Sequence, residues 1–413
     1  DVYKRQMSDS ARGLAIFRHR DFRYYSASRF LWGMALQIQT IAVAWFIYEQ
    51  TRDALALGFI GLAMFLPSVP LSLVTGAAAD RYDRKKIFSI GYGMTALCAA
   101  ALCALAYQSL IWPIYLVIIG VGTVRSFANP AGQALVVSTV PSPEYPAATA
   151  WTNSINQTAN VIGPAIGGLL FPFGVMVPFV VAFVCFAVAT ICALCISAPA
   201  PRTGGKPPVT WGLLLAGYRF IGTRPVILGS LTLDLIAVLM GGATALLPIF
   251  ASEVFQTDST GLGLLRAMPA IGAIIAGIAL AHFPISRKVG KLLFASVAIY
   301  GFATIGFGLS TNMLVAMGFL LIIGSADVVS VVIRQSIIQL ETPDEMRGRV
   351  IAVHTILTGT SNNLGDFESG ALAHFIGAVP TVIVGGLSAV VATVIWMRLF
   401  PQLLARDHIA PVK

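Results

Sequence analysis

Five ionisable residues lie deep within long apolar stretches, where a charged side chain is costly. They are Arg125, Asp234, Asp327, Asp366 and Glu368. Each such charge at the centre of a membrane helix costs roughly 2.5–3.5 kcal/mol on insertion scales. A buried carboxylate can bind and release a proton, and a buried charge can attract an opposite charge on a ligand. These residues therefore predict a polar cavity for a small solute and for protons inside an apolar protein.

Proton binding is expected to need at least one of Asp234, Asp366 and Glu368, with Asp366 ranked first for its depth. Asp366 and Glu368 are two residues apart, so on a helix they point roughly 200° away from each other. One is expected to face the cavity and the other a neighbouring helix. Three arginines nearer the ends of their stretches are expected to reach the membrane interface: Arg29, Arg266 and Arg334.

Amide side chains form a second polar feature of the same stretches. They are Asn153, Asn156, Gln157, Asn160, Asn362 and Asn363. Such amides either bind a ligand or join neighbouring helices, and the second role is favoured. His354 and His374 are interpreted as packing residues in preference to a proton relay. The cysteines lie in apolar stretches without histidine neighbours, so neither disulfides nor metal ligands are expected.

Composition identifies the elements that must position these residues. Hydrophobic residues make up 57% of the chain and charged residues 11%, against about 25% charged residues in soluble globular proteins. The sequence lacks the alternation expected of outer-membrane strands, so membrane helices of ~20 residues are predicted. Twelve candidate spans follow, at 23–48, 54–79, 86–107, 112–138, 147–172, 176–197, 225–250, 261–283, 291–309, 313–338, 350–376 and 380–400.

Basic residues between the spans predict the orientation of the chain. Nearly all of them fall on the side of the two termini, and Arg52 alone falls on the opposite side. Positively charged loops stay in the cytoplasm, so both termini are predicted to be cytoplasmic. The net charge of +9 then reflects contact with anionic lipid, and no nucleic-acid partner is expected. Residues 1–6, which precede Met7, are interpreted as a non-native, adaptor-derived segment.

The spans divide into two predicted halves, 7–197 and 225–413, joined by a linker at 198–224. The linker is rich in Pro and Gly, and its second part is predicted to form an amphipathic interfacial helix. Gln133 aligns with Gln335 at an offset of 202 residues, which also aligns Pro141 with Pro343. Because the matched segments have the same place in each half, duplication is favoured.

The loop after the second predicted span carries the sequence GAAADRYDRKKI, which contains Gly76, Asp80, Arg81 and Arg84. This spacing resembles the inner-loop signature of the major facilitator superfamily. The resemblance implies that these four residues form an inner gate, with Asp80 facing Arg349 at the start of the eleventh span. In the corresponding loop of the second half the acidic residue is replaced by Ala281, which predicts a weaker gate there.

The resemblance extends from Phe22 to about Phe400 and is strongest to the enterobactin-exporter-like branch of that superfamily, through segments such as FANPAGQAL at 127–135. In the fifth span, Gly163, Pro164, Gly167 and Gly168 resemble the G-P-x-x-G-G pattern of exporters. The earlier glycine of that pattern is replaced by Ala159. Small residues at this spacing also serve simple close packing of helices, so both interpretations stay open.

These observations predict an all-α membrane protein with twelve transmembrane helices in two pseudo-symmetric six-helix halves, the major facilitator fold. The resemblance implies a proton-coupled exporter of a small amphipathic or siderophore-like compound in a bacterial inner membrane, with import as the alternative. No P-loop, H-E-x-x-H or G-x-S-x-G motif occurs, so we expect neither ATP use nor an enzyme, and no cofactor or metal. The expected partners are substrate, protons and membrane lipid, and the protein is expected to be a monomer.

The offset also places Arg125 and Asp327 at matching positions of the fourth and tenth spans. Opposite charges there can pair across the central cavity that the resemblance implies. The alternative, slightly favoured, is that each charge is satisfied within its own half, for example Arg125 by Asn156. A double-mutant cycle with a charge swap distinguishes the two.

Overall fold

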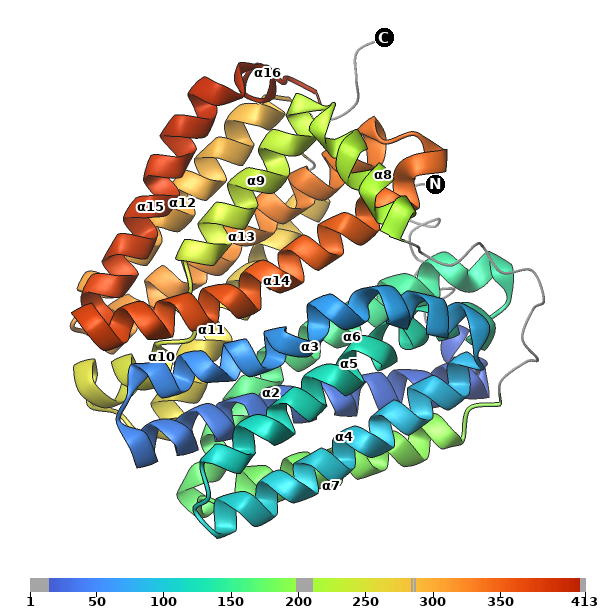
Figure 1. Ribbon diagram of the computed structural model, residues 1–413, viewed down its shortest axis with the longest axis vertical. Coiled ribbons are helices and arrows are strands. Elements are labelled where there is room, and N and C mark those ends of the chain that lie inside the picture. Colours follow the sequence, from blue (N-terminus) through green and yellow to red (C-terminus); the bar gives the residue numbers. More distant parts are fainter. Residues whose placement is uncertain (1–14, 198–210, 284, 286, 409–413) are drawn as a thin grey trace. The chain divides into compact units, whose positions relative to one another are not determined.

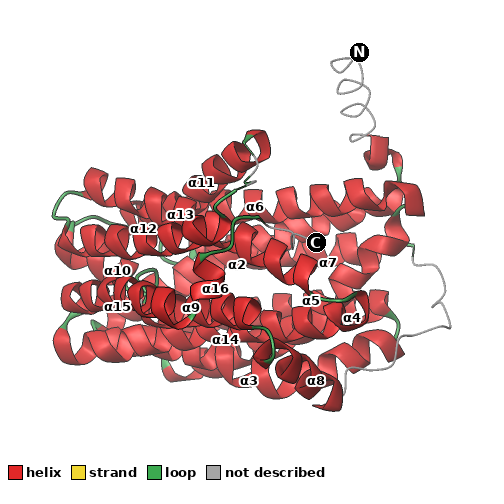
Figure 2. Cartoon of the chain, turned by 90° about the horizontal axis from the view of Figure 1, so that it is seen from above, coloured by secondary structure: helices red, strands yellow, loops and turns green. Residues whose placement is uncertain are grey.

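The computed structural model describes residues 15–197, 211–283, 285 and 287–408, which form helices joined by loops, without strands (Figures 1 and 2). Short helices are η1 (Ile16–Arg18), η2 (Ser142–Glu144), η3 (Phe171–Phe173) and α16 (Pro401–Leu404). The long helices before the linker are α2 (Arg20–Thr51), α3 (Ala54–Arg81), α4 (Arg84–Tyr107), α5 (Trp112–Thr139), α6 (Tyr145–Leu170) and α7 (Val177–Leu194). Those after it are α9 (Pro225–Met240), α11 (Ser259–His282), α12 (Val289–Leu309), α13 (Met313–Glu341), α14 (Asp344–Ile376) and α15 (Ala378–Leu399).

Each predicted span overlaps one of these long helices. Within the described residues, eight helices are long and apolar enough to cross a membrane, and nine if the bent pair of α8 and α9 is one span. The fifth and eleventh predicted spans, α6 and α14, are not among the eight. Both carry the amide belt, and α14 also carries Asp366 and Glu368. The amide belt therefore lies on two helices that have the same place in each half.

The seventh predicted span is broken, so the prediction of a continuous helix over 225–250 is wrong. Helix α9 ends at Met240, and the chain continues through Gly241 and Gly242 to α10 (Leu247–Ile249) and the π-helical turn η4 (Phe250–Val254). A Cβ atom at Gly242 would lie 2.3 Å from Oγ of Ser369, and one at Gly241 would lie 2.7 Å from the hydroxyl of Tyr300. The two glycines thus allow the break to fit against α12 and α14.

Part of the predicted linker forms a helix, α8 (Trp211–Gly222). It meets α9 at 102° and packs on α14, where a Cβ atom at Gly217 would lie 3.0 Å from the carbonyl oxygen of Arg349. Residues 198–210 of the linker, and the predicted adaptor-derived residues 1–6, lie outside the described residues.

Contacts between Cα atoms separate the chain into two compact units. The first comprises residues 1–42 and 70–208, and the second comprises residues 43–69 and 209–413. Residues 43–69, which the sequence assigns to the first half, thus group with the second unit. The domain limits of 7–197 and 225–413 stay a prediction.

Each unit has its own apolar core. In the first unit α4 packs against α5 and α7, around a core that includes Phe88, Tyr92 and Phe186. In the second unit α13 packs against α11 and α12, and α9 packs against α14 and α15 (Figure 1). Helix α13 begins at a defined point, because the side chain of Asn312 accepts hydrogen bonds from the backbone of Leu314 and Val315. This arrangement fixes the register of the helix that carries Asp327 and Arg334.

Candidate functional site

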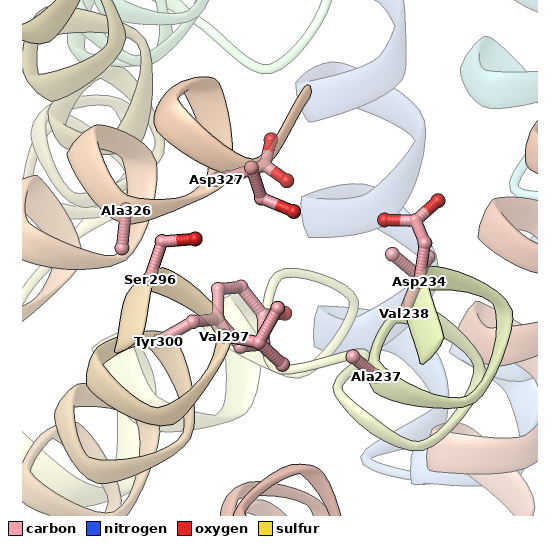
Figure 3. A pocket seen from close by; sticks show the side chains of 9 residues that line it. Asp234, Ala237, Val238, Ser296, Val297, Tyr300, Ala326 and Asp327 are labelled. Atoms are coloured by element: carbon pink, nitrogen blue, oxygen red, sulfur yellow. The ribbon is translucent and has the colours of Figure 1, made fainter. Parts of the chain in front are cut away.

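Three helices of the second unit line a small polar pocket (Figure 3). Asp234 comes from α9, Ser296 and Tyr300 come from α12, and Asp327 and Ser330 come from α13. Asp327, Ser330 and Arg334 are spaced three and four residues apart, so they share one face of α13. The cavity volume is about 10 Å³, close to the minimum that holds one water molecule. Two carboxylates therefore face a space suited to a water molecule or a proton.

A buried ion pair forms the centre of this site. Nη1 of Arg334 lies 2.6 Å from Oδ1 of Asp234, and the two side chains are 2% and 8% exposed. The same Nη1 donates a hydrogen bond to Oγ of Ser330 at 3.2 Å, whereas Nε makes no hydrogen bond to a described residue. A buried pair of this kind is strongly destabilised when only one partner is removed, because the other charge is left buried and uncompensated.

The position of Arg334 contradicts its predicted place at the membrane interface. Its side chain is almost completely buried, and its charge is directed to Asp234 rather than to the surface. Sequence reasoning assigned Arg334 by its distance from the span end and missed its role. The spacing of Asp327, Ser330 and Arg334 along one helix face was the signal that could have found it.

Asp327 is the second carboxylate of the pocket, and it makes no hydrogen bond or ion pair with a described residue. One guanidinium can neutralise only one of the two carboxylates fully, and Arg334 is already paired with Asp234. Asp327 is therefore the carboxylate in the pocket that is available for a proton. The structure thus brings together two of the five predicted ionisable residues, Asp234 and Asp327.

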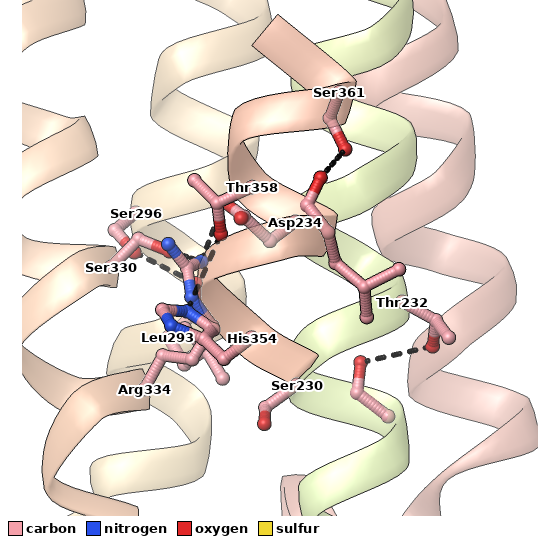
Figure 4. A network of polar contacts seen from close by, with 12 residues as sticks. Ser230, Thr232, Asp234, Leu293, Ser296, Ser330, Arg334, His354, Thr358 and Ser361 are labelled. Atoms are coloured by element: carbon pink, nitrogen blue, oxygen red, sulfur yellow. Dashed lines mark hydrogen bonds and ion pairs between the residues drawn. The ribbon is translucent and has the colours of Figure 1, made fainter. Parts of the chain in front are cut away.

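His354 of α14 joins this network (Figure 4). Its Nε2 lies 3.5 Å from Oγ1 of Thr358, and the charge of Arg334 is close enough to act on the ring. At the other end of the pocket the hydroxyl of Tyr300 donates to the carbonyl oxygen of Gly241 at 3.1 Å. This hydrogen bond connects the end of α9, at the Gly241–Gly242 break, to α12, which lines the pocket.

Asp366 and Glu368 do not line this pocket. Asp366 lies where α14 crosses α3, and a Cβ atom added at Gly61 would lie 2.7 Å from its Cβ. Glu368 accepts a hydrogen bond from Oγ of Ser369 at 3.4 Å. Farther along α14, Nδ1 of His374 lies 2.8 Å from Oδ1 of Asp53, and both side chains are about two-fifths exposed. The packing role predicted for His374 is therefore wrong.

In the first unit Asn156 contacts Arg29, whereas the sequence suggested a contact with Arg125. Its Oδ1 accepts a hydrogen bond from Nη2 of Arg29 at 3.2 Å. Arg29 is 8% exposed, so its predicted place at the membrane interface is wrong as well. Arg125 is half-buried and makes no hydrogen bond or ion pair with a described residue. The proposed pairing of Arg125 with Asp327 stays a prediction.

The glycines of the exporter-like motif place α6 against α2 within the first unit. A Cβ atom at Gly163 would lie 2.6 Å from Cβ of Gln37, and one at Gly167 would lie 3.2 Å from Cα of Ile38. Pro164 and Gly168 are buried in the same stretch of α6. Ala159, which replaces the earlier glycine of the motif, faces Gly33 on α2 at 3.1 Å. The missing glycine on one helix is therefore matched by a glycine on the other.

The predicted inner gate lies mostly outside the described side chains. Helix α3 ends at Arg81, and the side chains of Gly76, Asp80 and Arg81 are not described. Arg84 is exposed at the start of α4. Asp83 caps that helix, because its Oδ1 accepts a hydrogen bond from the backbone of Lys85 at 2.9 Å. The gate stays a prediction.

Comparisons with known proteins agree with the fold and with the membrane helices. The model of the Major Facilitator Superfamily matches residues 25–366, and the chain belongs to this superfamily. Its fold is accordingly that of an all-α membrane protein with twelve helices in two pseudo-symmetric halves. The chain is a multi-pass membrane transporter and not an enzyme.

Two curated relatives cover nearly the whole chain. The staphyloferrin A transporter of Staphylococcus aureus is 24% identical over 91% of this chain and 95% of its own length. The enterobactin exporter EntS of Citrobacter koseri is 26% identical over 93% of each chain. The first is named as a transporter and the second as an exporter.

Solved structures share the fold at low sequence identity. A bacterial homologue of the human lysosomal transporter Spinster superposes with a TM-score of 0.75 and 14% identity, over 95% of this chain and 99% of that one. A bacterial homologue of the iron transporter ferroportin superposes with a TM-score of 0.70 and 15% identity, over 94% of this chain and 99% of that one. At these identities the likeness concerns the fold alone.

Proposed function

We propose that this transporter exports a small amphipathic or siderophore-like compound in exchange for protons. The observation that carries the proposal is the pocket in which Asp234 and Asp327 face one guanidinium, that of Arg334. Two carboxylates with one cation and room for a water molecule form a site where one proton can be taken up and released.

Proton exchange at Asp327 can change the contact between α9 and α13. With a proton on Asp327, Asp234 keeps Arg334 without competition. Loss of that proton leaves two anions competing for Arg334, and the pair of Asp234 and Arg334 weakens. Since α9 ends two residues after Val238 of the pocket, at the Gly241–Gly242 break, a change in this pair acts on a helix that has a pliant point. Discontinuous helices at the substrate and ion sites are common in secondary transporters.

The substrate class and direction rest on the relatives. Their names point to siderophores, and EntS is named as an exporter. The exporter-like glycines at the α2–α6 crossing, Gly163 and Gly167, support the same direction. Import by the same fold is the alternative. The proposal includes Asp80 and Arg81 in an inner gate, cytoplasmic termini, an inner-membrane location and a monomer.

The experiment uses the purified protein in liposomes that contain a pH-sensitive dye, with an imposed pH gradient. Iron-free enterobactin and staphyloferrin A, the compounds named for the relatives, serve as probes. Addition of a transported probe should dissipate the gradient, whereas a matched solute that is not transported should leave it intact. A gradient that no probe changes would contradict proton exchange with siderophores.

Direction is tested separately in cells that express the protein. Everted vesicles should accumulate the probe when their interior is acidic, and right-side-out vesicles should not. Accumulation in right-side-out vesicles would instead establish import.

A further inference from the structure

The first unit contains a buried arginine that pairs with no carboxylate among the described residues. Arg29 of α2 is 8% exposed. Its Nη2 donates to Oδ1 of Asn156, a neutral acceptor, at 3.2 Å. Its Nε and Nη1 make no hydrogen bond with a described residue. An unpaired buried cation is expensive in a membrane protein, and such residues usually have a functional partner.

The acidic residues of the unit are engaged elsewhere. Those with described side chains are Asp21, Asp83 and Glu144. Asp21 accepts a hydrogen bond from the backbone of Ser197, Asp83 caps α4, and Glu144 pairs with Arg18 and His19. Among the described residues of this unit, no carboxylate is therefore left for Arg29.

Two further buried side chains, on α2 and α4, carry hydrogen-bond donors. Tyr92 of α4 is 1% exposed, and its hydroxyl lies close enough to interact with Arg29. That hydroxyl and Nε1 of Trp32 make no hydrogen bond of ordinary geometry with a described residue. A guanidinium, a phenol and an indole N–H together match an acceptor with more than one oxygen atom.

The walls of this site are aromatic. The rings of Trp32 and Tyr92 stack with centroids 5.2 Å apart and an interplanar angle of 10°. The ring centroids of Phe88 and Tyr92 are 4.1 Å apart. A Cβ atom at Gly132 would lie 2.9 Å from Phe88 and 3.4 Å from Nη1 of Arg29. The guanidinium of Arg29 therefore lies in a buried, largely aromatic environment.

A polar route leads from this arginine to the surface of the unit. Asn156 is half-buried, whereas Asn153 and Asn160 on the same helix are exposed. The contact between Arg29 and Asn156 connects the buried guanidinium to this exposed polar face of α6. An anionic group could therefore reach Arg29 along α6 by displacing the amide of Asn156.

We infer that Arg29, Tyr92 and Trp32 form a binding site in the first unit for the carboxylate-type group of an anionic compound. The inference rests on the proposed function for its biological role, because it names the anionic end of the exported compound. Binding itself needs neither a proton gradient nor transport. The binding test can therefore fail while proton exchange stands, and it can succeed if proton exchange fails.

The test is calorimetric titration of the purified full-length protein with two probes of the same shape, 2,3-dihydroxybenzoate and its neutral amide, 2,3-dihydroxybenzamide. The wild type should bind the benzoate more tightly than the amide. Arg29→Gln should weaken benzoate binding by about tenfold to a hundredfold, the range for loss of charge-assisted hydrogen bonds, and should leave amide binding unchanged. Arg29→Lys should give an intermediate affinity, because it keeps the charge and loses the planar fork of donors.

Arg18→Gln is the matched control, because Arg18 belongs to the same unit but is exposed and paired with Glu144. It should bind the benzoate like the wild type. Size-exclusion elution identifies any misfolded variant, and Arg29→Lys tests the site if Arg29→Gln does not fold. The inference would be overturned by no benzoate binding by the wild type, by equal benzoate affinity in Arg29→Gln, or by equal affinity of the wild type for the amide. Inorganic phosphate bound as tightly as the benzoate would also overturn it, in favour of a general anion site.

Discussion

The first unit buries Arg29 beside an amide and a tyrosine, whereas the second unit buries Arg334 beside a carboxylate. The offset of 202 residues aligns Gly132 with Arg334, and Nη1 of Arg29 lies close to Gly132. Each unit thus has a guanidinium near the same position of its fourth helix. In one unit it is supplied by α2, and in the other by α13 itself.

The difference lies in what neutralises the charge. The guanidinium of Arg334 has a fixed partner, Asp234, and a second carboxylate nearby, so its site can respond to a proton. The guanidinium of Arg29 has no carboxylate partner among the described residues of its unit, so its site can respond to an anionic ligand. A duplicated framework can in this way hold a proton site in one unit and a substrate site in the other.

The largest expected effect is on stability in the second unit. Arg334→Met should lower the free energy of unfolding by about 3–5 kcal/mol, because it leaves Asp234 buried without a counter-charge. The double variant Arg334→Met with Asp234→Leu should recover most of that loss. Denaturant unfolding in detergent measures both, and a loss below about 1 kcal/mol for Arg334→Met would place this arginine at the interface after all.

A smaller effect is expected from the neutral partner of the same arginine. Ser330→Ala removes the hydrogen bond to Nη1 of Arg334 but leaves the ion pair intact. We expect a loss of about 1–2 kcal/mol, typical of a hydrogen bond to a charged group. The same unfolding assay checks this, with Ser336→Ala as control, since Ser336 is half-buried on the same helix and donates only to the carbonyl oxygen of Val332. A loss equal to that of Arg334→Met would mean that Ser330, and not Asp234, holds the guanidinium.

The smallest effect is expected in the first unit. Arg29→Met removes a charge that has no carboxylate partner among the described residues, so without ligand the free energy of unfolding should stay the same or rise by up to about 1 kcal/mol. The measurement is again unfolding in detergent, made in buffer free of carboxylates. Destabilisation as large as that of Arg334→Met would mean that Arg29 also has an internal counter-charge. The proposed difference between the two units would then be wrong.

The sequence predicted the helices well and singled out the two carboxylates that line the pocket, because both signals are local. Length and hydropathy predict a span, and a charge within an apolar run predicts a site, as for Asp234 and Asp327. The arginines were misassigned for a physical reason. Distance from a span end does not determine which face of the helix a residue occupies, and a long side chain can reach inward as easily as outward. Arg29 and Arg334 both reach inward.

The break after α9 was also missed. A Gly-Gly pair in an apolar run does not by itself end a helix. Here it does so because Tyr300 and Ser369, distant in sequence, approach the two glycines closely. The amides of α6 were predicted to join neighbouring helices, and Asn156 and Asn160 do contact Arg29 and Gln37 of α2, but the sequence does not show that one of these contacts is with a buried charge. Contacts of this kind depend on tertiary structure.

The central claim is that Asp327 carries the exchanged proton while Asp234 holds Arg334. The direct test compares Asp327→Asn with the wild type in liposomes, with a transported compound as probe, by recording proton flux and isotope exchange of the compound in parallel. We predict that Asp327→Asn abolishes probe-driven proton flux but retains exchange of the probe across the membrane, because the amide keeps the shape of the carboxyl group and cannot exchange a proton. Wild-type proton flux in Asp327→Asn would contradict the account.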